Sequence, residues 1–435
     1  MTPLESARII RDHIADKLHV EAQIDEELGY ALTGQCSPVV LVVPTHEEQI
    51  TNILCTAYEH KWKVMPIGAL TQVEMGFASE AVDIALSLKR LDRVIEYSPT
   101  DMTIAVGAGI TLTALQEVTR VHGQRLPFDP VCHKEATIGG LIATNVSGPS
   151  RALYGSLRDI TIGLTVVYPD GQMIRTGGKV VKNVAGYDMT KLFIGSLGTL
   201  CVITEVIFKL KPIPQQSDVN LIEVKYNDLA VLITKLRTSD MVTSQFELMS
   251  VHELSERDEF LLAVGCDEHV AAAEVQAKRI QSICGAMSLR VTHLTGKAAD
   301  DYWDSYRTHL AGQRSVIRFT CAPTFIVEIA KEMQVNIDQN VFIGISVTVP
   351  IGTGRLYVHP LNESSTLHVL RMCRELLYTY DGSAVIEKAP QTRMTLVDVE
   401  PLGVLQDAVK TLTVGIKQTI DQRGILSPGR FVGGI

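Results

Sequence analysis

The sequence predicts an α+β fold built from two domains behind a short helical segment. A strand–helix–strand pattern occupies residues 38–67, and a glycine-dense stretch with its own strand hairpin occupies residues 136–214. After this stretch, short strands alternate with helices, a pattern that favours an antiparallel sheet with helices packed on one face. We therefore expect an N-terminal helical segment at 1–36, a first domain at 37–214 and a second domain at 215–435.

The first elements follow from their end signals and their spacing. Thr2-Pro3-Leu4-Glu5 is typical of a capping box with proline in the first turn, so a helix is expected up to Leu18. Prolines bound a strand at 38–44, and a second capping box, Thr45 to Glu48, is expected to open a helix that ends near His60. The strand at 63–67 then completes a β-α-β unit, which predicts a parallel pair with a crossover helix.

Further strands are expected at 83–88, 94–97 and 103–106, with a helix beginning at Thr111. The intervening Gly107-Ala-Gly109 lacks the third glycine of a nicotinamide-binding turn, because Leu112 stands in its place. This departure disfavours a dinucleotide site of the Rossmann type.

The stretch from 136 to 214 is the densest in glycine, and it contains a hairpin of strands at 161–167 and 173–176. Each glycine removes a Cβ and permits positive φ, so the backbone can approach a flat and bulky ligand. We interpret that ligand as a flavin. Residues 195–198 lack the spacing of a nucleophile elbow, and residues 177–179 lack that of a phosphate-binding P-loop.

The second domain is expected to contain an antiparallel sheet with helices on one face. Its predicted strands are 215–225, 260–266, 316–319, 341–349 and 354–358, and its predicted helices are 228–238 and 271–284. Three arginines of this domain, Arg314, Arg318 and Arg355, could bind a carboxylate, although exposed charge on a sheet edge is the favoured interpretation.

Composition narrows the classes of partner. The chain has 435 residues, 46% of them hydrophobic and 20% charged, as in ordinary globular proteins. A net charge of −9 without a clustered basic run disfavours nucleic acid. No apolar run approaches the roughly 20 residues of a spanning helix, and the N-terminus carries charges throughout, unlike a secretory signal. We expect a cytoplasmic protein that meets the inner face of the membrane only through partners.

Metal chemistry finds little support in the sequence. The eight cysteines contain no C-x-x-C pair, which disfavours an iron–sulfur or structural zinc site, so no metal ligand is assigned. His359 and His368 are the only histidines late in the chain, and no close histidine pair with a nearby glutamate accompanies them. His133 is the histidine nearest in sequence to the glycine-rich stretch, but a lone loop histidine is more often a surface residue. The catalytic residue stays unknown.

A dense series of motifs resembles FAD-binding proteins of the vanillyl-alcohol oxidase type, also called the PCMH type. Within that superfamily the order of the motifs, and the closing segment 425–435, are most similar to the FAD-binding subunit of glycolate oxidase (glycolate dehydrogenase). The motifs are Pro127-Phe-Asp-Pro130, Ala136-Thr-Ile-Gly-Gly140, Ala143-Thr-Asn145, Ser147-Gly-Pro149, Tyr154-Gly155, Arg158-Asp159, Lys182-Asn183, Gly186-Tyr-Asp188, Gly195-Ser-Leu-Gly198 and Thr204-Glu205.

The resemblance implies a two-lobed PCMH-type FAD-binding domain at 37–214, with 215–435 as an α+β cap over the flavin ring. No histidine follows Gly68 before Leu86, so FAD is expected to be non-covalent. The loop at 67–71 would take the diphosphate. The full set of cofactor-binding residues that the resemblance implies is Ile67, Gly68, Ala69, Leu70, Thr71, Pro130, Thr137, Gly139, Gly140, Thr144, Asn145, Ser147, Gly148, Tyr154, Arg158, Gly195, Gly198, Val202 and Ile203.

Two departures from the family pattern predict that FAD is held weakly or has been lost. Ala69 and Leu70 follow Gly68 where the family has glycines. If both positions need left-handed backbone, each costs about 1 to 2 kcal/mol, against about 12 kcal/mol for a nanomolar cofactor. Cys201 replaces a glycine expected beside the ring, where its side chain could crowd the flavin.

The resemblance implies an FAD-binding subunit of a multi-subunit 2-hydroxy-acid dehydrogenase. A catalytic FAD subunit would oxidise glycolate to glyoxylate, and an iron–sulfur subunit would carry the electrons onward. Two alternatives remain open at this point: a flavin-free structural subunit of the same complex, and a self-sufficient FAD-dependent 2-hydroxy-acid oxidase. The missing histidine cluster speaks against the last of these.

Overall fold

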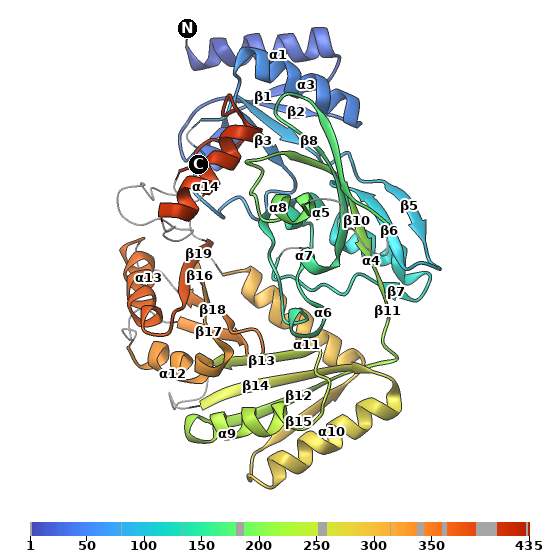
Figure 1. Cartoon of the computed structure of the whole chain (residues 1–435), viewed down its shortest axis with the longest axis vertical. Helices are drawn as coiled ribbons and strands as arrows, with labels where there is room; N and C mark the ends of the chain where they lie inside the picture. The colour runs from blue at the N-terminus through green and yellow to red at the C-terminus, as the bar shows by residue number, and fades with distance from the viewer. Residues whose placement is uncertain are drawn as a thin grey trace.

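A computed structural model describes residues 2–79, 81–132, 134–179, 187–250, 259–313, 315–336, 343–358, 363–388, 407–431 and 434–435. Two units are stacked along the long axis of the molecule (Figure 1). The first contains two sheets, and the second contains one large sheet whose helices lie mostly on the side away from the first unit. No helix in these ranges is long and apolar enough to cross a membrane.

The first sheet belongs to an N-terminal lobe. Helix α1 (Pro3–Leu18) begins with the predicted capping box, in which the Glu5 amide donates to the Thr2 hydroxyl over 3.3 Å and the Thr2 amide donates to the Glu5 carboxylate over 2.7 Å. The sheet has the strand order β1-β2-β4-β3 and carries α2 (Glu26–Thr33) and α3 (Glu47–His60). Its strands are β1 (Glu21–Asp25), β2 (Val39–Val43), β3 (Val64–Ile67) and β4 (Ile84–Ser87).

Two local predictions for this lobe need correction. Strands β2 and β3 are parallel, but β4 lies between them and pairs with both, so the β-α-β unit leaves a gap that a later strand fills. The second capping box does not form. Helix α3 begins at Glu47, and the side chain of its N-cap residue His46 makes no capping hydrogen bond. The helix thus begins one residue later than the pattern predicts. The Thr45 backbone amide instead donates to the side-chain oxygen of Gln49 over 2.8 Å.

The second lobe contains a five-stranded antiparallel sheet with the order β5-β6-β10-β8-β9. The predicted hairpin is its β8–β9 edge. A two-stranded ribbon of β7 (Gln124–Arg125) and β11 (Lys211–Pro212) leads to the second unit. The remaining elements are β5 (Val94–Ser98), β6 (Thr103–Gly107), α4 (Leu112–Arg120), α5 (Ile138–Thr144), α6 (Arg151–Tyr154), α7 (Leu157–Ile160), β8 (Thr161–Val167), β9 (Met173–Gly177), α8 (Met189–Phe193) and β10 (Val202–Lys209).

The second unit is organised on an eight-stranded sheet with the order β15-β12-β14-β13-β17-β18-β16-β19. Every neighbouring pair is antiparallel, as the sequence predicts. The strands are β12 (Gln216–Lys225), β13 (Gln245–Ser250), β14 (Glu259–Glu268), β15 (Val291–Thr295), β16 (Ser315–Thr320), β17 (Ile343–Thr348), β18 (Thr353–Val358) and β19 (Ser383–Lys388).

The expectation that helices cover one face of this sheet is only partly correct. One face carries α9 (Tyr226–Arg237), α10 (Val270–Gly285), the 3-10 helix η1 (Pro323–Phe325), α12 (Ile326–Asn336) and α13 (Glu363–Tyr378). Helix α11 (Lys297–Ala311) packs on the opposite face, between the sheet and the first unit (Figure 1). Alternate residues of β12 show the division, since Ile222 joins the core of the first face and Val219 packs with Trp303 of α11.

The C-terminal segment returns to the first unit, although the sequence assigned it to the second. Helix α14 (Asp407–Ile420) is followed by a tail that runs beside β3, where the Val64 amide donates to the Ile425 carbonyl over 2.8 Å. The Ser427 amide then donates to the Val64 carbonyl over 3.0 Å. A domain boundary placed at residue 215 assigns everything after it to the second unit. It misses this pairing because Val64 and Ile425 are more than 350 positions apart in the chain.

Candidate functional site

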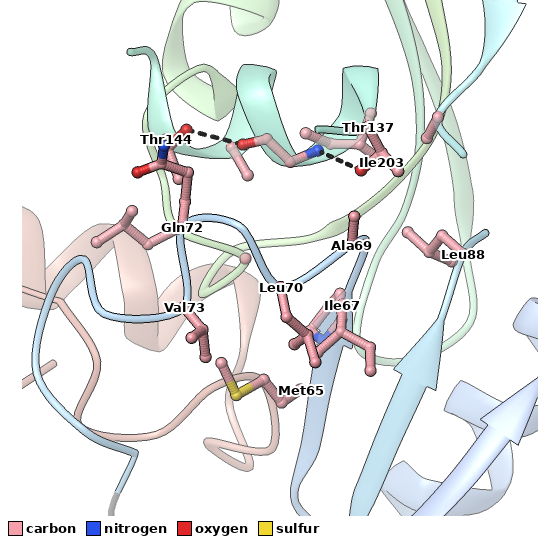
Figure 2. A pocket seen from close by; sticks show the side chains of 18 of the residues that line it. Met65, Ile67, Ala69, Leu70, Gln72, Val73, Leu88, Thr137, Thr144 and Ile203 are labelled. Atoms are coloured by element: carbon pink, nitrogen blue, oxygen red, sulfur yellow. Dashed lines mark hydrogen bonds between the residues drawn. The ribbon is translucent and has the colours of Figure 1, made fainter. Parts of the chain in front are cut away.

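A pocket of the first unit, called the main pocket below, lies between its two lobes, where the loop after β3 faces α5 (Figure 2). It has a volume of about 790 Å³, including its open mouth, and a mainly apolar lining. Figure 2 shows Met65, Leu70 and Val73 on one side and Thr137 and Thr144 on the other. The lining residues are Met65, Pro66, Ile67, Gly68, Ala69, Leu70, Thr71, Gln72, Val73, Leu88, Ala108, Thr137, Gly139, Gly140, Ala143, Thr144, Leu197, Gly198, Cys201, Ile203 and Arg430.

The pocket brings together most of the residues implied by the resemblance. The whole loop from Ile67 to Thr71 lines it. Six more implied residues line it, from α5 and its N-cap, from the segment before β10 and from β10 itself: Thr137, Gly139, Gly140, Thr144, Gly198 and Ile203. These eleven residues are far apart in sequence, so their convergence is a property of the fold.

The loop after β3 closes tightly over Thr137. A Cβ added at Gly68 would lie 2.1 Å from the Thr137 hydroxyl oxygen, so glycine is required there by the close approach. Leu70 adopts the left-handed region with φ +60°, whereas Ala69 is not among the residues with positive φ. The expected strain therefore applies to Leu70, where a branched side chain occupies a conformation suited to glycine, and it does not apply to Ala69.

Helix α5 supplies the opposite wall. Thr137 is its N-cap, accepting from the Gly140 amide over 3.4 Å, and the Thr144 hydroxyl donates to the Gly140 carbonyl over 2.8 Å. Gly139 packs directly on the residue that follows β6, since a Cβ there would lie 2.8 Å from that of Ala108. Gly140 is different. A Cβ there would lie 3.2 Å from the Thr137 hydroxyl oxygen, a tight contact that a small shift of the Thr137 side chain could relieve.

Cys201 lines the pocket from the residue before β10 and is almost fully buried. Burial raises the pKa of its thiol, because nothing nearby stabilises a thiolate. The side chain is therefore a small neutral group in the pocket wall, as expected if it occupies space that a glycine would leave open.

The other eight implied residues do not line this pocket. Asn145 caps the end of α5 with φ +51°, and its buried side-chain oxygen has no hydrogen-bond partner. Val202 points into the core of the N-terminal lobe, and Arg158 is exposed on α7. Tyr154 bonds to residues at the boundary between the units. The remaining four are Pro130, Ser147, Gly148 and Gly195.

Several residues named from sequence lie outside the described ranges, and their placement is not assigned. They are His133, Lys182, Asn183, Gly186, Arg314 and His359. Among the residues that the structure does describe, no three His, Cys, Asp or Glu side chains gather as metal ligands would.

Arg430 is the pocket residue that sequence reasoning missed. It lies in the C-terminal tail, is 4% exposed, and donates through Nη2 to the Val73 carbonyl over 2.8 Å. Its Nη1 is buried without a hydrogen-bond partner, and burial lowers the pKa of the guanidinium to about 10. The signal was present in Ser427-Pro-Gly-Arg430, part of the closing segment noted for its resemblance, but only the fold places that tail at the pocket.

A second, smaller pocket of about 370 Å³ adjoins the first at Thr71 and Gln72 and opens toward the sheet of the second unit. Its opposite wall includes Arg355 and Glu387. Arg355 is buried, which corrects the expectation of exposed charge on a sheet edge. Its Nε lies 2.6 Å from the Glu387 carboxylate, and its Nη2 donates to the Ser147 carbonyl over 2.8 Å.

Each member of this ion pair shifts the pKa of the other. Burial opposes both charges, but Glu387 raises the pKa of Arg355, and Arg355 lowers the pKa of Glu387 below its ordinary range. Cys132, on the same pocket, has its pKa raised to about 12, mainly by burial, and is a neutral thiol. Arg318, on the neighbouring strand, is half-buried.

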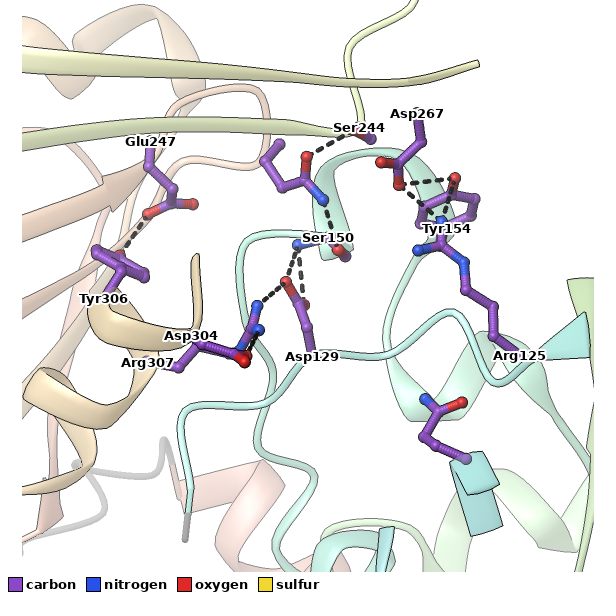
Figure 3. Close-up of polar contacts among 12 residues, drawn as sticks. Arg125, Asp129, Ser150, Tyr154, Ser244, Glu247, Asp267, Asp304, Tyr306 and Arg307 are labelled. Atoms are coloured by element: carbon purple, nitrogen blue, oxygen red, sulfur yellow. Dashed lines mark hydrogen bonds and ion pairs between the residues drawn. The ribbon is translucent and has the colours of Figure 1, made fainter. Parts of the chain in front are cut away.

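Polar contacts join the two units beside this pocket (Figure 3). Asp129 of the first unit accepts from the Ser150 amide over 3.0 Å and lies 3.5 Å from Arg307 of α11. A second group pairs Arg125 with Asp267 of β14 at 2.7 Å, and the Tyr154 hydroxyl bonds to both side chains. These buried contacts fix the cap against the first unit.

Glu247 of β13 lies close to this boundary and is the centre of a buried network in the second unit (Figure 3). Burial raises its pKa to about 7, partly offset by hydrogen bonds from Thr348 and Ser346. The Tyr306 hydroxyl also donates to it, over 3.1 Å. The carboxyl group is thus well supplied with donors, but it does not line either of the two pockets described above.

The lining of the main pocket fits a flavin dinucleotide on two observations. The walls are mainly apolar, as a planar ring requires. The unpartnered guanidinium nitrogen of Arg430 is complementary to an anionic group. This chain's residues therefore offer a place for a ring and a place for a charge.

Comparison with known proteins agrees with this geometry. Residues 38–177 match the family described as an FAD binding domain. The chain is 27% identical over 426 residues to the mitochondrial D-lactate dehydrogenase [cytochrome] of Arabidopsis thaliana, covering 91% of this chain and 73% of the relative. It is 37% identical over 181 residues to glycolate oxidase subunit GlcD of Bacillus subtilis (strain 168), covering 42% of this chain and 38% of the relative.

A further relative is glycolate oxidase subunit GlcE of Escherichia coli (strain K12), 39% identical over 125 residues, or 28% of this chain and 36% of the relative. Among solved structures, an alkyldihydroxyacetonephosphate synthase superposes with a TM-score of 0.70 at 15% identity, covering 98% of this chain and 85% of the other. That likeness establishes the fold. The chain therefore has an α+β fold with a PCMH-type FAD-binding domain, it is similar to FAD-linked oxidoreductases, and FAD is its cofactor.

Proposed function

We propose that this chain is the FAD-binding subunit of a multi-subunit 2-hydroxy-acid dehydrogenase whose substrate is glycolate. In that complex a sister FAD subunit oxidises glycolate to glyoxylate, and the two electrons released leave through an iron–sulfur subunit while two protons are released. Support comes from relatives named as glycolate oxidase subunits. Bound FAD supplies a two-electron acceptor, and this chain's residues supply its binding site.

The observation that supports an accessory role for this chain, with catalysis in the sister subunit, is that the Arg355 guanidinium already has partners within the protein. A 2-hydroxy acid needs a cation for its carboxylate near the flavin, and arginine is suited to that task. Arg355 lies in the pocket between the units, but its guanidinium is already bound by Glu387 and by the Ser147 carbonyl. Lys388, the other described cation of that pocket, donates to the Ala311 carbonyl over 3.1 Å. The cations of this pocket therefore have structural partners.

The test compares the isolated chain with the chain purified together with its partner subunits. Flavin released on denaturation is quantified, and oxidation of glycolate, D-lactate and D-2-hydroxyglutarate is followed with an artificial electron acceptor. We expect FAD in both samples. Turnover of glycolate should be at least about 100-fold slower in the isolated chain, the scale of losing a transition-state interaction.

Two outcomes would contradict the proposal. Turnover by the isolated chain at the rate of the complex would favour the self-sufficient FAD-dependent oxidase, for which the alignment over 91% of the chain is the supporting observation. A preference for D-lactate or D-2-hydroxyglutarate in the complex would reject glycolate as substrate while leaving the subunit role intact. Substitution of Arg355 by Gln separates the cases, because a structural ion pair affects stability and leaves the KM of the complex for glycolate unchanged.

A further inference from the structure

The C-terminal tail is fixed to the pocket by a buried ion pair. Lys417 of α14 donates to the Asp421 carboxylate over 2.6 Å, to the Thr199 carbonyl over 2.7 Å and to the Leu426 carbonyl over 2.8 Å. Asp421 in turn accepts from the amides of Ile425 and Leu426. Because every partner is buried, this arrangement gives the tail a defined course alongside β3.

Beyond this anchor the tail is held by the loop that follows β3. The Phe77 amide donates to the Arg430 carbonyl over 3.1 Å, and the Ser79 hydroxyl donates to the Pro428 carbonyl over 2.9 Å. Gly76 has φ +86°, and a Cβ there would lie 2.7 Å from the Arg430 carbonyl oxygen. The loop after β3 thus fixes the position of the Arg430 carbonyl, and with it the position from which the Arg430 side chain extends.

The side chain of Arg430 is unusual among the buried cations of this chain. Lys417 and Arg355 each have a carboxylate partner. Arg430 forms no ion pair with any residue that the structure describes, its Nη1 has no partner, and burial alone lowers its pKa. A buried charge without an opposite charge is costly, so the protein without its ligand is penalised at this position.

The pocket defines the ligand that would remove that penalty. Arg430 is the one charged side chain among the described residues that line it, and the other lining side chains are apolar or neutral. In FAD the diphosphate carries the formal negative charge, while the ring system, ribityl chain and adenosine are neutral at pH 7. A guanidinium donates charge-assisted hydrogen bonds to phosphate oxygens, and the buried Nη1 of Arg430 has no partner within the described protein.

We propose that Arg430 is a cofactor-binding residue whose guanidinium pairs with the diphosphate of FAD, so that the C-terminal tail forms part of the cofactor site. The inference uses the FAD cofactor that the proposed function also requires, but it does not depend on which acid is oxidised. The Arg430 guanidinium keeps its bond to the Val73 carbonyl and gains the phosphate as its counter-charge.

The test measures binding of three ligands to flavin-depleted protein by titration calorimetry: FAD, ADP and riboflavin. FAD and ADP carry the diphosphate, and riboflavin does not. Arg430→Gln keeps a donor for the Val73 carbonyl and removes the charge. Arg423→Gln is the matched control, because Arg423 lies in the same tail but is exposed, bonding to the Tyr58 carbonyl over 2.6 Å outside the pocket.

We expect Arg430→Gln to weaken FAD and ADP by about 10- to 100-fold, the range for a hydrogen bond to a charged group. Riboflavin affinity should change little, and Arg430→Lys should recover part of the FAD affinity. The melting temperature of flavin-depleted Arg430→Gln should equal or exceed that of the parent, since an unpaired buried charge is gone. Arg423→Gln should leave all three affinities unchanged.

Three results would overturn the assignment. Equal loss for riboflavin and ADP would mean that Arg430 only shapes the pocket. Loss for riboflavin with ADP unchanged would place the guanidinium at the ring. Unchanged FAD affinity, with a lower melting temperature of the depleted protein, would make Arg430 a structural donor to Val73. None of these readouts uses catalysis, so failure here is distinct from failure of the proposed function.

Discussion

At the scale of single residues, the pocket combines a required glycine with a strained leucine. Gly68 cannot be replaced without displacing Thr137, whose hydroxyl lies where a Cβ would be. Leu70 keeps a left-handed conformation, which for a leucine costs about 1 to 2 kcal/mol, and part of that cost is offset by packing of its side chain against the cluster around Val39 and Met65. The loop therefore holds its shape through neighbouring contacts.

The residue-scale prediction concerns this loop. Leu70→Gly should tighten FAD by up to about tenfold, because the leucine side chain leaves the pocket. Because glycine adopts φ +60° without strain, the substitution also removes a backbone cost from the folded protein. Ala69→Gly should not tighten FAD, since Ala69 is not at positive φ and the substitution only adds freedom to the chain. Fluorescence titration of the two variants measures the difference. Equal tightening by both substitutions would show that the Leu70 side chain is not what limits affinity.

At the scale of elements, α14 is attached through a buried ion pair and through Ile416 and Ile420, which pack against the core of the second lobe. Lys417 satisfies one carboxylate and two backbone carbonyls, and one of those carbonyls, Thr199, follows directly on the pocket residue Gly198. Burial lowers the pKa of Lys417, opposed by Asp421. The helix thus joins the glycine turn before β10 to the tail that carries Arg430.

Removing this lysine should be severe. Lys417→Met leaves Asp421 as an uncompensated buried charge and two carbonyls without a donor, so we expect a loss of about 3 to 5 kcal/mol in the free energy of unfolding. Lys410→Met, on an exposed position of the same helix, should change it by less than about 0.5 kcal/mol. Urea denaturation gives both values. A loss below about 1 kcal/mol for Lys417→Met would mean that α14 is not anchored here.

At the scale of the whole molecule, polar contacts hold the two units together. Asp267 of the large sheet is almost fully buried and receives hydrogen bonds from Arg125 and Tyr154 of the first unit. Burial disfavours the charge on Arg125, but Asp267 outweighs this and raises its pKa. Tyr154, expected along the cofactor, thus contributes to the boundary between the units.

We expect Asp267→Asn to weaken the docking of the units by about 2 kcal/mol, the scale of a charged hydrogen bond, because Arg125 keeps its charge and loses its counter-charge. Differential scanning calorimetry should then show the single transition broadening or splitting. Asp301→Asn, which removes an exposed partner of Lys297 on α11, is the control and should leave the transition as it is. An unaltered transition in Asp267→Asn would show that other contacts fix the units.

Elements with strong local signals could be predicted from sequence. The capping box at Thr2, the strand at 39–43 and the hairpin at 161–177 each depend on neighbouring residues, and each is present. The failure at Thr45 shows the limit of such signals, because Gln49 competes with Glu48 for the same backbone amide. A sequence motif indicates which capping hydrogen bond can form, whereas the geometry of the helix start decides which of two nearby side chains accepts it.

By itself, the sequence determined the α+β class, most strands and helices, the antiparallel cap sheet and the loop that lines the pocket, because glycine spacing and apolar periodicity act over a few residues. The tertiary structure alone decided that β4 separates β2 from β3, that α11 lies between the units, and that the tail brings Arg430 to the pocket. These features join residues distant in the chain. Their pairing depends on which apolar surfaces and buried charges find partners in the folded protein, and no local pattern records that.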